Sequence, residues 1–173
     1  MRLLIVRHAK AFERDPVRWP DDSERPLTRE GVKEFRRMAS RLRRWLEVPD
    51  EVASSGWSRA WRTAEVLAEE AGWPQPARCA HLEDGDEAGA FAGLLELVRS
   101  RGHLESLALV GHEPTLGRFA AVLLTGGAAG AGLQVRKGAL LELEVDPDRP
   151  VGAALRTMVH PGVFAGKRRN RGG

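Results

Sequence analysis

The feature that most constrains the fold is a short aliphatic run, residues 3–6, which ends in Arg7 and His8. Strands of a parallel sheet are buried on both faces, so they read as continuous apolar runs. In open α/β sheets, ligands bind outside the carboxyl ends of such strands. Arg7 and His8 are therefore expected where this type of fold carries out its chemistry. The alternative is a strand that merely ends in surface-polar residues.

A second aliphatic run, residues 107–110, leads into His112. Because parallel strands end at the same edge of a sheet, His8 and His112 are expected to converge there. Arg59 follows a third predicted strand, at the start of a helix, and should face the same edge. The sequence thus predicts a cluster of two histidines and two arginines, namely His8, His112, Arg7 and Arg59.

Strands and helices alternate along the chain, which is typical of an α/β fold. Thr28 is a suitable N-cap for an amphipathic helix, and Thr115 for a later one. The alternation predicts a three-layer α/β/α sandwich whose mostly parallel sheet has an antiparallel edge, formed by the last two strands. The predicted strands are 3–7, 51–54, 76–81, 107–112, 139–145 and 152–159, and the predicted helices are 29–46, 59–71, 87–101 and 115–124.

The chain is expected to form one domain, residues 1–163, followed by a basic tail, 164–173. The tail carries four positive charges, whereas the whole chain has a net charge of +3, so the remainder is close to neutral. A solvated terminus is the favoured interpretation, and a nucleic-acid partner is not expected. A long polar segment, residues 10–26, follows the first strand, and loops of this length are usually functional or mobile.

Composition narrows the class of protein further. A hydrophobic content of 42% and a charged content of 29% are ordinary for a globular protein, and no apolar run is long enough to cross a membrane. The single cysteine, Cys79, excludes an internal disulfide and fits a reducing compartment, so we expect a cytoplasmic location. It also lacks a neighbouring glycine-rich loop, which argues against a cysteine phosphatase.

The charges at the predicted site favour an anion over a metal. Arg7 and Arg59 would repel a divalent cation and attract a phosphate. No metal-binding spacing, P-loop or serine-esterase elbow occurs in the sequence. We therefore expect neither a metal nor a cofactor.

Taken together, the motifs resemble the histidine phosphatase superfamily, which has the phosphoglycerate-mutase-like fold. They occur in the family's order and span most of the chain. They are Arg7-His8-Ala9, Arg25-Pro26-Leu27-Thr28 with Gly31, Ser54-Ser55 with Arg59-Ala60 and Thr63-Ala64, and Val110-Gly111-His112-Glu113-Pro114 with Leu116-Gly117. The short length and the Gly-His-x-Pro form look most like the SixA-type phosphohistidine phosphatases within this superfamily.

Two departures from the family pattern stand out. Gly56 replaces a proline that often follows the serine, which we expect to affect loop stiffness more than chemistry. Many members also carry an acidic residue that donates a proton to the leaving group. The corresponding region contains Glu83 and Asp84, and neither gives a convincing match.

The resemblance and the residues together imply a mechanism. Neutral His8 would attack phosphorus, and Arg7 and Arg59 would neutralise the phosphoryl oxygens and lower the pKa of the nucleophile. His112, either neutral or protonated, would donate to a phosphoryl oxygen. Arg25 is a further candidate phosphate contact, with anchoring of the 10–26 loop as its alternative role.

The expected substrate is phosphohistidine on a signalling protein of the histidine phosphotransfer type, because an imidazole leaves without a dedicated acid. The alternative is a small phosphorylated metabolite, cleaved by a phosphomonoesterase of the same superfamily. A phosphoglycerate mutase is disfavoured by the short chain. A non-catalytic module that binds phosphate or nucleic acid is the more distant alternative, and no membrane partner is expected.

Overall fold

The computed structural model describes residues 1–83, 87–126 and 133–164, and in this part of the chain the α/β prediction is confirmed. One six-stranded sheet has the order β3-β2-β4-β1-β5-β6. The strands are β1 (Arg2–Arg7), β2 (Glu51–Ser54), β3 (Ala77–Arg78), β4 (Ser106–Gly111), β5 (Leu140–Glu144) and β6 (Ala154–Val159). The helices are α1 (Arg29–Leu42), α2 (Ser58–Ala71), α3 (Glu87–Ser100) and α4 (Thr115–Thr125).

The strand directions match the predicted mixture. β1 to β4 are parallel, whereas β5 pairs antiparallel with both β1 and β6. In the central β1–β4 pair, Arg7 lies in register with Gly111. His8 and His112, which follow these two residues, therefore leave the sheet at the same level.

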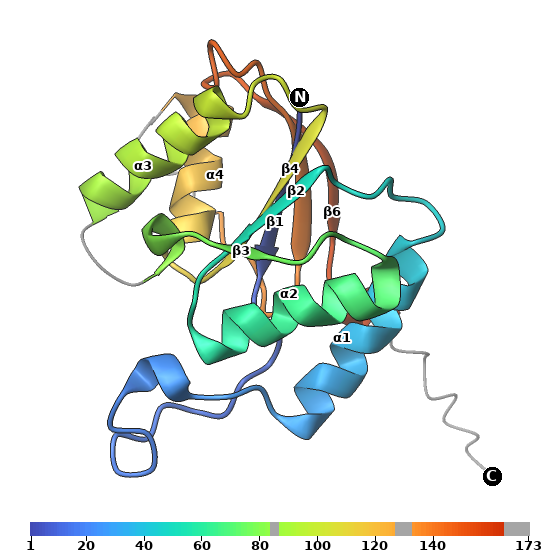
Figure 1. The fold of residues 1–173 in the computed structure, drawn as a ribbon, viewed down its shortest axis with the longest axis vertical. Helices are drawn as coiled ribbons and strands as arrows, with labels where there is room; N and C mark the ends of the chain where they lie inside the picture. Colours follow the sequence, from blue (N-terminus) through green and yellow to red (C-terminus); the bar gives the residue numbers. More distant parts are fainter. Residues whose placement is uncertain (84–86, 127–132, 165–173) are drawn as a thin grey trace, which may run out of the picture.

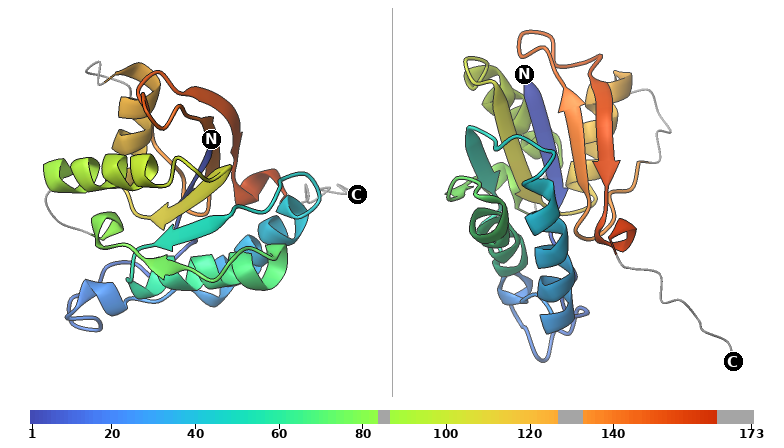
Figure 2. Two further views of the ribbon diagram at one scale, coloured as in Figure 1. Left: turned by 45° about the horizontal axis from the view of Figure 1, so that its top comes forward. Right: turned by 90° about the vertical axis from the view of Figure 1, so that its right-hand side faces the viewer.

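The sheet lies between two helical layers, α1 with α2 on one face and α3 with α4 on the other (Figures 1 and 2). Successive β1 side chains point to opposite faces. Leu4 and Val6 accordingly pack with α1 and α2, whereas Leu3 and Ile5 pack with α3 and α4. The aliphatic run is continuous because both of its faces are covered.

The end of α1 and the N-cap of α4 differ most from the prediction. Thr28 caps α1 as expected and accepts a hydrogen bond from the Gly31 N–H, but the helix ends at Leu42 instead of residue 46. The apolar pattern extends past the helix because Leu46, in the following turn, is still buried in the core. Thr115 is the first residue of α4, and Pro114 occupies the N-cap position without a side-chain bond.

The last described residue, Phe164, lies against the first helix. Phe164, which the sequence assigns to the basic tail, packs against the core, and Arg41 of α1 donates a hydrogen bond to its carbonyl. The rest of the tail, residues 165–173, lies outside the described residues. No helix within the described ranges is both long and apolar enough to cross a bilayer.

Candidate active site

His8 and His112 lie side by side at the carboxyl edge of the sheet. Their ring centroids are 5.2 Å apart, and the two residues are only 5% and 6% exposed. Backbone hydrogen bonds hold this edge together, since the His8 N–H donates to the Gly111 carbonyl and the Ser55 N–H donates to the Val110 carbonyl. The two strand ends therefore form one rigid platform for both rings.

The His8 ring is held by its own loop. Its Nδ1 lies 2.7 Å from the Ala9 carbonyl oxygen, which can only accept a hydrogen bond, so Nδ1 carries the proton. In the neutral ring, Nε2 is then unprotonated and has a lone pair available for attack.

The surroundings of His8 keep its ring neutral. Burial is the largest cause and lowers the pKa of His8 to about 3. The hydrogen bond to the Ala9 carbonyl opposes burial with a smaller effect, and the charges of Arg59, Arg7 and Lys137 lower the pKa further. A histidine with such a pKa is uncharged at neutral pH. His8 can therefore act as a nitrogen nucleophile without first losing a proton.

The His112 ring is held through the opposite nitrogen. Its Nε2 lies 2.8 Å from the hydroxyl of the buried Ser55, and that hydroxyl accepts a hydrogen bond from the Trp57 N–H. Its buried Nδ1 has no hydrogen-bond partner within the described part of the chain. The Trp57 ring packs against the His112 ring, with their centroids 4.9 Å apart. Sequence reasoning missed Ser55 and Trp57 as supports of this ring.

The pKa of His112 is also lowered, to about 2. Burial is again the largest cause, followed by electrostatic effects of His8, which is protonated only at the low pH where His112 titrates, and of Arg59, Arg25 and Arg7. His112 is therefore neutral in the unliganded protein. The ring is neutral because it is almost fully buried and three arginines act on it, and its protonation while it donates to a phosphoryl oxygen stays a prediction.

Arg7 is held by the segment that leads into β5. Its Nη1 donates to the Val135 carbonyl at 2.8 Å, and the Val135 N–H donates to Glu113 Oε1 at 2.7 Å. The Glu113 carboxylate also acts electrostatically on Arg7, although burial is the larger influence and lowers the Arg7 pKa. Glu113, which sequence reasoning quoted only as part of a motif, thus helps to position Arg7.

Arg59 is buried and lies against Trp57, with its guanidinium carbon 4.5 Å from that ring's centroid. Its Nη1 donates to the Asp22 carbonyl at 2.7 Å, and its Nη2 lies 3.1 Å from Asp22 Oδ2. A loop residue that sequence reasoning missed therefore binds an arginine predicted to contact phosphate.

Arg25 binds the same carboxylate. Its Nε lies 2.7 Å from Asp22 Oδ1, its Nη2 lies 3.1 Å from Oδ2, and its Nη1 donates to the Phe12 carbonyl. Arg25 therefore anchors the 10–26 loop, while its predicted contact with phosphate stays a prediction. The hydrogen bonds to Arg25 are the largest cause that lowers the pKa of Asp22. Asp22 is thus an anion between two arginines.

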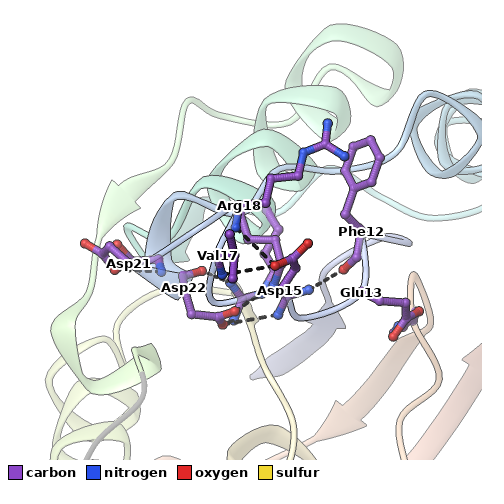
Figure 3. Close-up of polar contacts among 11 residues, drawn as sticks. Phe12, Glu13, Asp15, Val17, Arg18, Asp21 and Asp22 are labelled. Atoms are coloured by element: carbon purple, nitrogen blue, oxygen red, sulfur yellow. Dashed lines mark hydrogen bonds and ion pairs between the residues drawn. The ribbon is translucent and has the colours of Figure 1, made fainter.

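The 10–26 loop has internal contacts that hold Asp22 in place (Figure 3). Asp15 accepts hydrogen bonds from the N–H groups of Val17 and Arg18, and the Arg18 guanidinium lies 4.9 Å from the Phe12 ring centroid. Asp21 caps the short 3-10 helix that carries Asp22. The loop is thus built to present a carboxylate to Arg59.

Two motif positions have packing roles that explain their residue types. Thr63 Oγ1 accepts from the Ala9 N–H at 3.0 Å and donates to the Arg59 carbonyl at 2.7 Å, which ties α2 to the end of β1. A Cβ at Gly31 would lie 2.1 Å from the Lys10 carbonyl oxygen. Glycine is required there because the loop passes so close to α1.

Glu83, a candidate acid, is held as an ion. Arg78 binds both of its oxygens, at 2.7 and 3.0 Å, and the Gly56 N–H donates to Oε1 at 3.0 Å. The hydrogen bond from Arg78 is the main cause that lowers the pKa of Glu83, so this carboxylate is unprotonated at neutral pH. Asp84 lies outside the described residues.

Gly56 has a second role besides loop geometry. A Cβ at this position would lie 2.7 Å from Arg78 Nε and 2.9 Å from Glu83 Oε1. A proline would also lack the N–H that binds Glu83. Gly56, in place of the family's proline, therefore leaves room for the Arg78–Glu83 pair, in addition to its expected effect on the stiffness of the loop.

Within the described ranges, no three His, Cys, Asp or Glu side chains gather as a set of metal ligands. A metal-independent reaction stays a prediction. The arrangement shown is instead a neutral imidazole surrounded by arginines, which suits transfer of an anionic group.

Comparisons with known proteins agree with this geometry. The family model of the histidine phosphatase superfamily (branch 1) matches residues 3–94. An uncharacterized protein of Picosynechococcus sp. is 32% identical over 143 residues, which cover 83% of this chain and 84% of that protein.

Two solved structures show the same fold at low sequence identity. The protein histidine phosphatase SixA, complexed with tungstate, matches with a TM-score of 0.77 and 23% identity over 95% of this chain and 99% of that one. A mycobacterial glucosyl-3-phosphoglycerate phosphatase matches with a TM-score of 0.65 and 17% identity over 90% of this chain and 97% of that one.

Proposed function

The chain belongs to the histidine phosphatase superfamily (branch 1), and from this premise we propose that it hydrolyses phosphohistidine through a phosphorylated His8. The observation that carries the proposal is the state of the His8 ring. Its Nδ1 is bound to the Ala9 carbonyl, its pKa is lowered to about 3, and its Nε2 is left as the nucleophile.

The reaction has two steps. His8 Nε2 forms a bond to phosphorus while the bond from phosphorus to the leaving nitrogen breaks, and the electron pair of that bond stays on the leaving ring. Water then attacks the phosphorylated His8, which releases inorganic phosphate and restores the neutral imidazole. The leaving imidazole takes a proton from solvent on its other ring nitrogen, and the attacking water later returns one to solvent, so the protons balance and no protein acid is required.

The charged residues around His8 supply the stabilisation that phosphoryl transfer needs. Arg7 and Arg59 face the equatorial oxygens, where negative charge is concentrated. In the unliganded protein Arg59 binds the Asp22 carboxylate, and a phosphoryl oxygen would replace that carboxylate. His112 donates a ring N–H to a phosphoryl oxygen, with its orientation fixed by Ser55.

The state of Glu83 favours phosphohistidine over phosphate monoesters. An alkoxide leaving group benefits from a proton donor by roughly 10²–10⁴ in rate. Glu83 is ionised and bound by Arg78, so it is poorly suited to that role. An imidazole leaves without such a donor, and a site of this kind therefore suits a phosphoramidate.

The proposed partner is a phosphorylated signalling protein of the histidine phosphotransfer type, in the cytoplasm. The similarity to the SixA structure supports this choice. The second candidate is a small phosphorylated metabolite, because the mycobacterial phosphatase of the same fold acts on glucosyl-3-phosphoglycerate according to its name.

Steady-state kinetics can separate the two candidates. The kcat/KM of the purified protein should be clearly higher for a phosphohistidine peptide than for any of a panel of phosphate monoesters. Faster turnover of the monoesters would favour the metabolite phosphatase. Unchanged phosphate affinity in His8→Ala, with no turnover of either substrate by the natural protein, would instead indicate a binding module.

A further inference from the structure

The Asp22 carboxylate is bound to an arginine of the proposed phosphoryl site. Its Oδ2 lies 3.1 Å from Arg59 Nη2, and Arg25 binds the same carboxylate through two nitrogens. The Arg59 side chain is only 5% exposed, whereas that of Asp22 is 23% exposed. A carboxylate and a phosphoryl group both offer anionic oxygens that match the fork of a guanidinium. Asp22 therefore gives Arg59 the type of partner that a substrate would.

The charge of Arg59 acts on both histidines of the site. After burial, it is among the causes that lower the pKa of His8 and of His112. Asp22 is an anion because its hydrogen bonds with Arg25 are the largest cause that lowers its pKa. A negative charge of the chain itself is thus paired with a positive charge that the histidines sense.

Arg7 has a different kind of partner. Its Nη1 donates to an uncharged carbonyl, that of Val135, and its buried Nε has no hydrogen-bond partner within the described residues. The buried Nδ1 of His112 also lacks a partner in this part of the chain. A phosphoryl group would displace no carboxylate from these two atoms, whereas it must displace one from Arg59.

The Asp22 carboxylate can leave Arg59 without release of the loop. Arg59 Nη1 donates to the Asp22 backbone carbonyl, and Arg25 Nη1 donates to the Phe12 carbonyl. Neither of these bonds involves the carboxylate. Rotation of the Asp22 side chain alone is therefore enough to open the contact at Arg59 Nη2.

We propose that Asp22 is an internal competitor, whose carboxylate competes with phosphate for Arg59 and thereby determines how tightly the site holds inorganic phosphate. The apparent Kd of such a site equals its intrinsic Kd divided by the fraction of molecules in which the site is open. A carboxylate that occupies Arg59 in about nine of ten molecules weakens phosphate binding about tenfold. The proposal rests on the proposed function and adds to it a residue that eases release of the product.

Replacing the charge while keeping the shape of the side chain tests the proposal. Asp22→Asn retains an oxygen that accepts from arginine, but a neutral amide holds a guanidinium more weakly than a carboxylate does. Isothermal titration calorimetry with inorganic phosphate should give a Kd about tenfold lower for Asp22→Asn than for the natural protein. If Asp22 served only to hold Arg59 in place, the same variant would bind phosphate more weakly. The two roles therefore predict changes of opposite sign.

Asp15→Asn is a matched control on the same loop (Figure 3). Asp15 is exposed, and its carboxylate accepts hydrogen bonds from the backbone N–H groups of Val17 and Arg18. This variant loses the same charge, and its Kd for phosphate should stay within about twofold of the natural value because exposed charges are screened by salt. Equal tightening in both variants would assign the effect to net charge and overturn the competition.

A measurement on the natural protein decides the case in which Asp22→Asn does not fold. Titration with inorganic phosphate should shift the carboxyl carbon-13 NMR signal of Asp22, because the carboxylate leaves Arg59, and should leave the signal of Asp15 in place. An Asp22 signal that stays unchanged while phosphate binds would overturn the proposal.

The outcomes separate the two proposals. If His8-dependent turnover is present but a folded Asp22→Asn variant binds phosphate no more tightly than the natural protein, the internal competition is wrong and the phosphatase proposal stands. If the natural protein neither binds phosphate nor cleaves a phosphohistidine peptide or a phosphate monoester, the phosphatase proposal itself is overturned.

Discussion

The ends of β1 and β4 look equivalent, but the histidines that follow them have different hydrogen-bond partners. Both strands are aliphatic, both end in register, and each is followed by a buried imidazole whose pKa is strongly lowered. His8 is held through Nδ1 by a backbone carbonyl, whereas His112 is held through Nε2 by the Ser55 hydroxyl.

This difference separates two chemical roles. A carbonyl oxygen can only accept, so His8 has a fixed tautomer with its lone pair on Nε2. The Ser55 hydroxyl both accepts and donates, so it orients His112 without removing its ability to supply a proton. Under the proposed function, two identical side chains at equivalent strand ends would act as nucleophile and as donor because their hydrogen-bond partners differ.

Replacing His8, the proposed nucleophile, should have the largest effect of the changes that test the difference between the two histidines. His8→Gln should lower kcat on a phosphohistidine peptide by about 10⁴-fold or more, because no other group provides a covalent route. The measurement is single-turnover phosphate release, with circular dichroism to verify folding. Residual activity within about tenfold of the natural protein would assign the nucleophile elsewhere.

Removing the second histidine should have a smaller effect of a different kind. His112→Gln should lower kcat by about 10²–10³, the usual cost of losing one donor to a developing anion. A phosphorylated His8 should still form, though slowly. If both variants lost activity equally and neither formed a phosphoenzyme, the two rings would not have separate roles.

The lowered pKa values of both histidine rings predict how the stability of the fold depends on pH. Unfolded histidines bind protons near pH 6.5, whereas His8 and His112 stay neutral down to about pH 3 and 2. Below pH 6.5 the unfolded state therefore binds more protons, and each histidine lowers the free energy of unfolding by about 1.4 kcal/mol per pH unit.

Urea unfolding at pH 7 and pH 5 measures this effect. The two histidines together should cost roughly 4 kcal/mol between these values, and His8→Gln should remove about half of that dependence. A pH dependence that is identical in the natural protein and the variant would show that His8 titrates normally in the folded state.

The smallest predicted effect concerns Lys137, whose charge lowers the pKa of His8. The residue precedes Gly138, and the Gly138 N–H donates to the His8 carbonyl. Lys137→Met should raise the His8 pKa slightly and change kcat/KM at pH 7 less than about threefold, since partly exposed charges act weakly and the ring stays neutral. Nitrogen NMR of the His8 ring detects the shift, and Lys137→Arg should restore the natural value.

The sequence predicts the platform of the site better than its supports. His8, His112, Arg7 and Arg59 follow from strand ends and a helix start, because sheet topology brings such positions to one edge. Their partners come from elsewhere: Asp22 reaches Arg59 from a long loop whose path has no periodic pattern.

The ion pair between Arg78 and Glu83 also could not be predicted from the sequence. The contact of Glu83 with Arg78 and Gly56 depends on how two loops pass each other. A sequence pattern contains the acidic residue but not its partner, so it cannot distinguish a proton donor from one half of an ion pair. In the same way, the N-cap of α4 cannot be deduced from the presence of Thr115 alone.

The most direct test of the account is to trap the phosphorylated enzyme. The natural protein is mixed rapidly with N-phosphoimidazole, quenched in alkaline denaturant, and analysed by mass spectrometry of its peptides. The account predicts one phosphoryl group on His8, formed before phosphate is released and absent in His8→Gln. A phosphoryl group on another residue, or phosphate release without any phosphoenzyme, would contradict it.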